Sequence, residues 1–391
     1  MIPLMKSAFL HEAATKEALA EFIRAASRLS MDTKCLEFER AFAEYQGRSH
    51  AVLFNSGGSA NLGLVQALMN LDRLQRGARV GFSALTWSTN VMPLFQMGLE
   101  PIPVDVDRRT LNVMSATLED RMAETDLDAV FLTNAMGMAG DLEAIRSLCD
   151  AANILLLEDN CEALGTELPS GKTGNFGLAA TFSFFVAHHM STIEGGMVCT
   201  DDPELAMMLR VVRANGWDRN LSAEEQIRLR ERYEVGSELD AKYVFYELGF
   251  NLRPTEITGF LGLTQLRYLA ENIATRQANH LRLEQVSAAN PDLFDLDHDH
   301  IDVLSSFAFP VVVRSADLRA KYVAKFAGAG VEIRPMIAGN IQRQPFYKKF
   351  AHKEYDLPGT DFIHHCGFYC GNYPELTEAD LQALSLCLSH Y

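Results

Sequence analysis

The stretch NILLLEDN, residues 153–160, predicts the class of the fold. Its apolar residues 154–157 are consecutive instead of alternating with polar ones, which is typical of a strand covered on both faces in a parallel sheet. Glu158 and Asp159 follow at once. Because ligands of such sheets bind beyond the carboxyl ends of the strands, we expect these carboxylates beside a ligand site.

Similar runs recur on both sides of this stretch and alternate with helical patterns. The strand-like runs are AVLF (51–54), RVGFSAL (79–85), PIPVDVD (101–107), AVFLTNA (129–135) and GGMVCTDD (195–202). Apolar residues at helical spacing follow the first of them, at Leu62, Val65 and Leu68. This rhythm predicts an α/β fold with a mostly parallel sheet.

The pattern changes after about residue 220. Residues 228–244 are charged and predict a loop, residues 255–290 predict one or two long helices, and residues 306–313 predict a new sheet. We therefore expect two domains: a large cofactor-binding domain over residues 1–265, with an N-terminal helical segment, and a smaller α+β domain over residues 266–391.

Composition excludes several classes of partner. The chain has 35 basic and 51 acidic side chains, a net charge of −16, which repels nucleic acids and anionic membrane surfaces. About eighteen consecutive apolar residues would be needed to span a membrane, and no such run occurs. The first residues do not resemble a leader peptide. We expect a cytoplasmic protein without nucleic-acid or membrane partners.

The cysteines do not predict a metal site or a disulfide framework. The seven cysteines are scattered and lack CxxC or CxC pairs. Cys366 and Cys370, beside His364 and His365, are the grouping closest to a metal motif, but their spacing lacks a second pair elsewhere. We expect reduced thiols and no metal; the role of these four residues stays open.

Three strand-end positions suggest a cofactor site. Residues 55–61 form a Gly/Ser loop that opens into a helix, where the free amides of Gly57 and Gly58 can bind an anion; a simple turn with a helix cap is the alternative. Trp87 offers a flat surface for a heteroaromatic ring, although a core position is also open. Asp159 can pair with a protonated ring nitrogen, or merely cap the next helix.

The ordered set of motifs resembles a known family. SGGSANL (56–62), TW (86–87), LEDNCEALGTE (157–167), GKTGNFG (171–177), FSFF (182–185) and EGGMVCTDD (194–202) resemble the DegT/StrS family of sugar-nucleotide aminotransferases. The resemblance implies a fold-type I, aspartate aminotransferase-like enzyme that uses pyridoxal phosphate. In that family a lysine five residues after the serine of the FSFF motif binds the cofactor covalently. Here that position is His188.

Imidazole has no primary amine, so it cannot form this covalent bond, but it can move protons. The sequence resembles the histidine branch of the family, 3-dehydratases of nucleotide-linked 4-keto-6-deoxy sugars that use non-covalent pyridoxamine phosphate in deoxysugar synthesis, for instance of colitose. Four segments carry this resemblance: AHHMSTIEGG (187–196), RANGWDRN (213–220), GFNLRPTE (249–256) and RPMIAGN (334–340). A second branch with an iron cluster needs a CxC motif, which this sequence lacks.

The resemblance assigns the cofactor-binding residues one by one. Gly57, Gly58 and Ser183 would hold the phosphate, and Trp87 would stack on the ring. Asp159 would pair with the ring nitrogen. Two further assignments are Glu162 near the ring hydroxyl and Asn251 at the phosphate of the neighbouring subunit.

The resemblance also implies the reaction partners. His188 would be the catalytic acid and base, and Arg219 and Arg334 would bind anionic groups of the substrate or amino donor. It implies a GDP-linked sugar as the favoured substrate, L-glutamate as the amino donor, and a homodimer with shared active sites.

Alternatives remain at this stage. His189 could be the base instead of His188, but neighbouring side chains on an extended segment point apart, and the spacing selects His188. An aminotransferase could use another lysine, such as Lys172. A non-catalytic, regulatory cofactor-binding protein is the third possibility.

Overall fold

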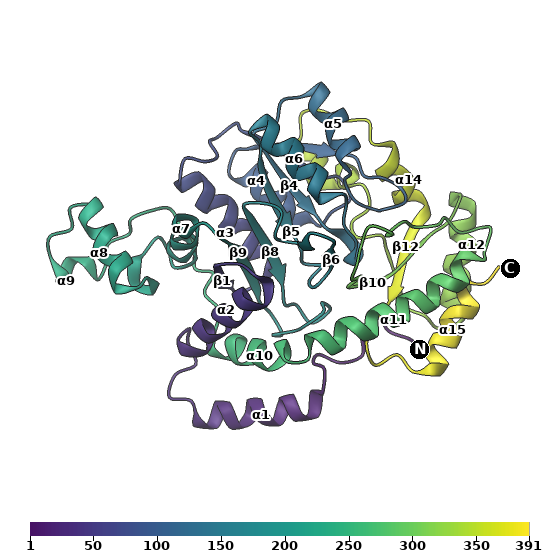
Figure 1. The fold of residues 1–391 in the computed structure, drawn as a ribbon, viewed down its shortest axis with the longest axis horizontal. Coiled ribbons are helices and arrows are strands. Elements are labelled where there is room, and N and C mark those ends of the chain that lie inside the picture. Colours follow the sequence, from purple (N-terminus) through teal and green to yellow (C-terminus); the bar gives the residue numbers. More distant parts are fainter. Residues whose placement is uncertain (391) are drawn as a thin grey trace.

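A seven-stranded sheet with the strand order β1-β9-β8-β5-β4-β2-β3 forms the centre of the molecule (Figure 1). The computed structural model describes residues 1–390. Strand β9 runs antiparallel to β1 and β8, and the other neighbours pair in parallel. In sheet order the strands span His50–Phe54, Gly196–Thr200, Ala179–Ser183, Leu155–Asp159, Ala129–Thr133, Arg79–Ser83 and Glu100–Val104. The predicted α/β fold with a mostly parallel sheet is confirmed.

Helices bury both faces of this sheet. Phe131 of β4 packs in a cluster with α3 (Gly57–Asn70), α4 (Met92–Gln96) and α7 (Pro203–Arg213). Its neighbours Val130 and Leu132 point to the opposite face, toward α5 (Ser115–Glu124) and α6 (Leu142–Ala152). On this second face of the sheet, α2 (Thr33–Gln46) covers the part near β1 and β8. Burial on two faces explains why the strands are apolar at consecutive positions.

A second sheet follows in the C-terminal part of the chain. It is antiparallel, in the order β10 (Ala308–Val312), β12 (Gly367–Gly371) and β11 (Ile333–Pro335). Its helices are α12 (Ala316–Gly328), α14 (Pro358–Cys366) and α15 (Glu378–Leu388), whereas Tyr347 of α13 (Pro345–Phe350) packs in the core of the large sheet. The long helix α11 (Leu269–Ala288) runs from α10 (Glu256–Leu266) to α15 (Figure 1). It therefore links the two parts.

The division into domains at residues 265 and 266 stays a prediction, and it falls between α10 and α11. At one end of α11, Ile273 packs with the core around α2, whereas Leu283 packs with the core of the second sheet. The first residues also belong with the second sheet, because Ile2 forms a bridge with Val331. The two parts thus share α11 and the N-terminal residues.

The charged stretch 228–244 is not simply a loop, so the sequence expectation was wrong there. Helix α8 (Ala223–Arg232) occupies its first residues, and α9 (Glu238–Ala241) lies within it. Ser222 caps α8: its Oγ accepts the amide of Glu225 at 3.3 Å, and the Glu225 carboxylate accepts the amide of Ser222 at 2.9 Å. This reciprocal capping satisfies the first amides of a helix that has little apolar surface.

The remaining elements are small or peripheral. Helix α1 (Glu12–Ala25) packs on α10 through Phe22 and Phe260, whose ring centroids lie 4.5 Å apart. Strands β6 (Glu167–Leu168) and β7 (Gly171–Lys172) form a hairpin. Short 3-10 helices span Ser88–Asn90, Ala135–Gly137, Asp218–Asn220 and Ile341–Arg343. Within residues 1–390, none of the helices has the length and apolar character needed to cross a membrane.

Candidate active site

A cleft of about 360 Å³ lies at the carboxyl ends of the parallel strands of the large sheet. The segments that end or follow β1, β2, β4, β5 and β8 supply its walls, with Gly57, Trp87, Thr133, Asp159 and Ser183 among the lining residues. This is where open α/β sheets bind ligands. The structure therefore brings the strand-end residues singled out in the sequence into one cavity, together with Gly58, Glu162 and His188.

The start of α3 forms an anion cup. The first amides of a helix have no acceptor within the helix. Ser56 Oγ accepts the amide of Ser59 at 3.0 Å, which leaves the amides of Gly57 and Gly58 for a ligand. A Cβ atom at Gly57 would lie 2.7 Å from Cβ of Ser183. Glycine is thus required where the helix start meets the end of β8.

Asp159 is buried at the base of the cleft, where two asparagines orient its carboxylate. Its Oδ2 accepts Nδ2 of Asn61 at 2.9 Å and Nδ2 of Asn90 at 2.7 Å, and its Oδ1 accepts the amide of Cys161 at 2.8 Å. Thr86 Oγ1 donates to Oδ1 of Asn90 at 3.0 Å, which turns the amide nitrogen of Asn90 toward Asp159. The carboxylate thus has a hydrogen-bond donor on each oxygen and a fixed orientation.

Sequence reasoning gave no role to these two asparagines. Asn61 lies in the Gly/Ser loop of residues 55–61, and Asn90 lies three residues after Trp87. Nearness to these predicted site residues was the only feature of the sequence that pointed to them. Their approach to Asp159 depends on how α3 and the 88–90 turn pack.

Glu158 plays a different part from its neighbour. Its carboxylate is fully buried and accepts the amides of Gly174, Phe176 and Gly177 at 2.7, 2.8 and 2.9 Å. Nδ2 of Asn134 adds a fourth donor at 3.2 Å. Glu158 therefore fixes the 174–177 loop to the end of β5 and faces away from the cleft.

Glu162 lines the cleft as a carboxyl group that readily holds a proton. Burial raises its pKa to about 7 and the charge of Asp159 adds to this, while the hydrogen bond from the Met136 amide, 2.9 Å long, opposes it. Near neutral pH this group can therefore either donate or accept a hydrogen bond.

His188 lies in the cleft between two aromatic rings. Its ring centroid is 6.3 Å from that of Phe185 and 5.2 Å from that of Phe307. Burial lowers its pKa to about 4, although the charge of Asp159 and the carbonyl of Cys161 act in the opposite direction. Its Nδ1 has no hydrogen-bond partner among the residues that the structure describes. His188 is thus a neutral imidazole at neutral pH.

His189 points away from the cleft, as the sequence argument expects. Its Nε2 is 2.8 Å from the carbonyl oxygen of Ser305, and its own carbonyl accepts Nδ2 of Asn272 at 2.6 Å. Burial lowers the pKa of His189 well below its ordinary value. These contacts give His189 a structural role.

No lysine lines the cleft within the described residues 1–390. Lys172 donates from Nζ to the carbonyl oxygen of Tyr45 at 2.7 Å and lies 4.4 Å from the centroid of its ring. It lines a separate cavity beside α11, with Gly165 and Ile273. This geometry contradicts the alternative in which Lys172 replaces the missing lysine.

Three predicted site residues do not line the cleft of the single chain. Asn251 is exposed and accepts Nε of Arg253 at 3.1 Å. The guanidinium carbon of Arg219 lies 5.2 Å from the ring centroid of Trp217, and Arg334 pairs with Glu332 at 2.6 Å. Their roles stay predictions.

Comparison with known proteins identifies the family. A profile of the DegT/DnrJ/EryC1/StrS aminotransferase family matches residues 11–388. The chain belongs to this family. Within the DegT/DnrJ/EryC1/StrS fold, the cleft described above combines the strand-end acids and the glycine cup with an imidazole at position 188.

Several proteins that this chain resembles are named as dehydratases. GDP-4-keto-6-deoxy-D-mannose 3-dehydratase of Yersinia pseudotuberculosis is 33% identical over 352 residues, which cover 88% of each chain. A solved GDP-4-keto-6-deoxymannose-3-dehydratase with a trapped PLP-glutamate geminal diamine is 29% identical, with a TM-score of 0.91 and full coverage of both chains. Another, a ColD mutant with bound GDP-perosamine, is 28% identical, with a TM-score of 0.90 and full coverage.

Proposed function

We propose that this protein is a 3-dehydratase of a nucleotide-linked 4-keto-6-deoxyhexose, a lyase that uses pyridoxamine phosphate without a covalent bond to the protein. The observation that carries the proposal is His188. A neutral imidazole stands in the cleft where aminotransferases of this fold need a primary amine, and the described lining contains no lysine.

The residues of the cleft fit such a cofactor. The Gly57 and Gly58 amides form a cradle that a Cβ would fill, which suits the phosphate arm. The carboxylate of Asp159 suits a protonated pyridine nitrogen, and Trp87, which is 58% exposed, offers a face for the ring. Glu162 suits the ring hydroxyl because it can share a proton near neutral pH. These five residues match the parts of one pyridoxamine phosphate.

The bound cofactor supplies an amine that condenses with the C4 ketone of the sugar and a ring that accepts electrons while the C3 hydroxyl leaves. The protein supplies the proton transfers. The unprotonated Nδ1 or Nε2 of His188 accepts a proton, and the resulting imidazolium can donate it to the departing hydroxyl, which leaves as water. Asp159, which Asn61 and Asn90 hold in place, would supply the negative charge that pairs with the protonated ring nitrogen.

L-Glutamate is the proposed amino donor, because each turnover converts the amine form of the cofactor to the aldehyde form and a second half-reaction must restore it. A GDP-linked 4-keto-6-deoxymannose is the proposed substrate on the strength of the relatives. We also propose a cytoplasmic location and a role in deoxysugar synthesis, for instance of colitose for lipopolysaccharide O-antigen.

We also propose a homodimer that shares its active sites. Beside the cleft, Trp87, Phe185 and Ile193 expose 58%, 42% and 49% of their surfaces, and exposed apolar residues that group together are typical of a protein contact. A second copy would cover them and could bring Asn251 or Arg219 to the cleft. These contacts would explain why both residues lie outside the cleft of one chain.

The decisive assay uses purified protein with pyridoxal phosphate, L-glutamate and a nucleotide-linked 4-keto-6-deoxyhexose, supplied in parallel as its GDP, CDP and dTDP forms. We expect a 3-deoxy product and one equivalent of ammonia, with the GDP form turned over best. His188→Asn should lower turnover by at least about 100-fold, because a removed acid/base group typically has this cost.

The same variant separates the alternatives. His188→Asn should still bind pyridoxal phosphate, which absorbance and equilibrium dialysis measure. Turnover of the variant at the wild-type rate would contradict the role of His188. Formation of a 4-amino sugar would indicate an aminotransferase, and binding without turnover of any of the three sugars would favour the non-catalytic alternative.

A further inference from the structure

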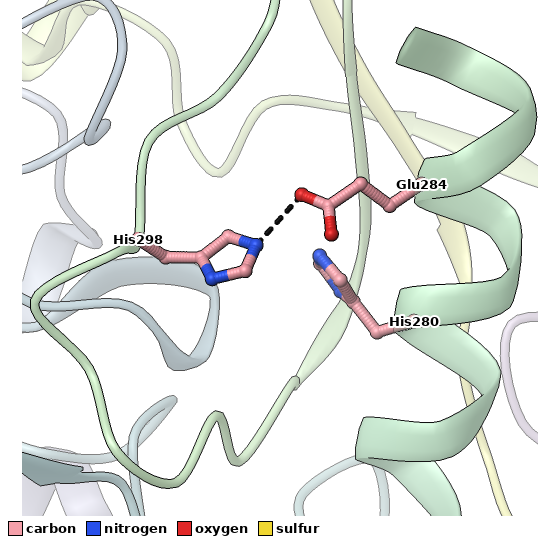
Figure 2. Close-up of side chains that lie close together, drawn as sticks. All are labelled: His280, Glu284 and His298. Atoms are coloured by element: carbon pink, nitrogen blue, oxygen red, sulfur yellow. Dashed lines mark hydrogen bonds and ion pairs between the residues drawn. The ribbon is translucent and has the colours of Figure 1, made fainter.

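Three potential metal ligands meet beside the second half of α11. His280 and Glu284 lie one turn apart on this helix, and His298 reaches them from the loop that precedes β10 (Figure 2). One ligand atom from each residue lies within 4.8 Å of the other two. Nε2 of His298 is 2.6 Å from Oε1 of Glu284, and the rings of His280 and His298 are nearly perpendicular, with centroids 5.7 Å apart.

A hydrogen-bond network sets the tautomer of His280. Its Nδ1 lies 2.8 Å from Oγ of Ser306. That hydroxyl also accepts Nδ2 of Asn372 at 3.0 Å and donates its single proton to the carbonyl of Ala308 at 3.1 Å. The arrangement that satisfies all three partners places the proton of His280 on Nδ1. Nε2 is then left with a lone pair, as in histidines that bind metals through one nitrogen while the other donates to a fixed partner.

The site is enclosed but has room for one more ligand. His280 is 2% exposed, and the side chains of His298 and Glu284 are 15% and 31% exposed. A cavity of about 160 Å³ adjoins His280 and Glu284 and extends to Asp295. None of the three cluster residues lines the cofactor cleft. The cluster is therefore separate from the active site.

We propose that His280, Glu284 and His298 bind one divalent cation of the Zn²⁺ type. Two imidazole nitrogens and one carboxylate oxygen form a ligand set that zinc prefers, whereas Ca²⁺ and Mg²⁺ prefer oxygen ligands only. Ligands about 2.1 Å from a tetrahedral ion are about 3.4 Å apart, so the 2.6 Å contact between His298 and Glu284 would open slightly, and ligand atoms that lie farther apart, up to 4.8 Å, would approach one another. Water in the cavity would complete the coordination.

Binding of the cation would also depend on pH. The short contact between His298 and Glu284 needs a proton on Nε2 of His298 in the metal-free protein. The cation would take the place of that proton at Nε2, and because protons compete for the ligand atoms, binding should weaken as the pH falls. Because the sequence separates His298 from Glu284 by a loop with no recognised motif, spacing rules alone do not find this site.

The network links this site to the cleft. Ser306, which binds His280, precedes Phe307, whose ring lies 5.2 Å from that of His188. Arg276, one turn before His280 on α11, donates from Nη1 to the carbonyl of Phe307 at 2.8 Å. A cation at His280 would therefore stiffen the segment that packs against His188, a structural effect and not a chemical one.

The test uses full-length protein that has been treated with a chelator and dialysed. We expect titration with Co²⁺ to give the visible absorption of a tetrahedral site and to saturate at one ion per chain. Zn²⁺ should displace the Co²⁺ and raise the melting temperature by a few degrees. His298→Asn should lower the affinity for both ions by at least about 100-fold. Circular dichroism checks that this variant is folded.

Two matched variants control for adventitious histidine binding. His11→Asn removes a histidine that precedes α1 and pairs with Glu271 of α11, since Nε2 of His11 lies 3.2 Å from Oε2 of Glu271 without a second histidine. His300→Asn removes a histidine of the same loop that contacts the carbonyl of Ala139. Both should bind Co²⁺ like the wild type. The proposal is overturned if the wild type gives no tetrahedral Co²⁺ signal, or if folded His298→Asn binds as tightly as the controls.

Discussion

Gly57 and Ser183 come so close at the phosphate cup that the glycine cannot be replaced without displacing its neighbour. In Gly57→Ala the new methyl group would lie 2.7 Å from Cβ and 3.0 Å from Oγ of Ser183. The start of α3 or the end of β8 must shift, and both carry groups proposed to bind the phosphate. We expect the dissociation constant for pyridoxal phosphate to rise by at least about tenfold, equal to 1.4 kcal/mol, in an absorbance titration.

Gly236→Ala is the control for this prediction. No atom lies within 4 Å of a Cβ at Gly236, and its backbone is free of the left-handed strain that disfavours alanine. It should bind the cofactor like the wild type. Equal affinities of the two alanine variants would mean that the glycine cup does not hold the phosphate.

At the residue scale the sequence indicated which side chains meet but not what surrounds them. The family spacing selected His188 over His189, and the structure places only the first in the cleft. The partners of Asp159 depend on packing between distant segments, which local patterns do not encode. Ile193 is another example: its φ of 72° is rare for a β-branched residue, and no residue pattern announces it.

At the scale of elements, Glu158 of β5 holds the 174–177 loop through hydrogen bonds from three backbone amides. Glu158→Gln replaces one carboxylate oxygen by an amide nitrogen that would face backbone N–H donors instead of accepting from them. Because a buried donor without an acceptor is costly, we expect the free energy of unfolding to fall by about 3 kcal/mol in urea titrations. Glu354→Gln, at an exposed carboxylate, should leave it unchanged within about 0.5 kcal/mol. Equal stability of the two variants would contradict this role of Glu158.

Six strands of the large sheet were predictable because burial on both faces leaves an apolar run that a sequence shows directly, whereas β8, whose sequence is AATFS, was not predicted. Helix α8 was missed for the opposite reason: its capping by Ser222 and Glu225 stabilises a helix whose surface is mostly charged. The antiparallel direction of β9 was also hidden, since its apolar run looks like those of its parallel neighbours. Direction depends on the connections and not on the strand itself.

At the scale of the whole molecule, α11 joins the cores of the two sheets, which is why a single boundary at residue 265 stays a prediction. The helix packs on α2 near Ile273 and on the second sheet near Leu283. It also carries Arg276, which fixes the segment before β10 beside His188. The sequence predicted one or two long helices over residues 255–290, but a helical pattern does not say that one helix packs against both parts.

The stability of the whole molecule should depend on pH through two opposing groups of the cleft. The pKa of His188 is lowered from 6.5 to about 4, so as the pH falls through this window the unfolded chain takes up a proton that the folded chain refuses, and stability is lost. The pKa of Glu162 is raised from 4.5 to about 7, so the folded chain takes up the proton first, and stability is gained as the pH falls. His189, with its lowered pKa, acts in the same direction as His188.

Removing either ionisable group should reveal the pH dependence that the other contributes to the free energy of unfolding. Between pH 7.5 and 5.5, Glu162→Gln should lose about 2 kcal/mol more unfolding free energy than the wild type, because the stabilising proton uptake is gone. His188→Asn should lose about 1 kcal/mol less over the same range. Urea unfolding of the cofactor-free protein measures both, with His352→Asn as a control at an exposed ring. If the two variants change the pH dependence in the same direction, burial does not set the charges of the cleft in the way that the structure indicates.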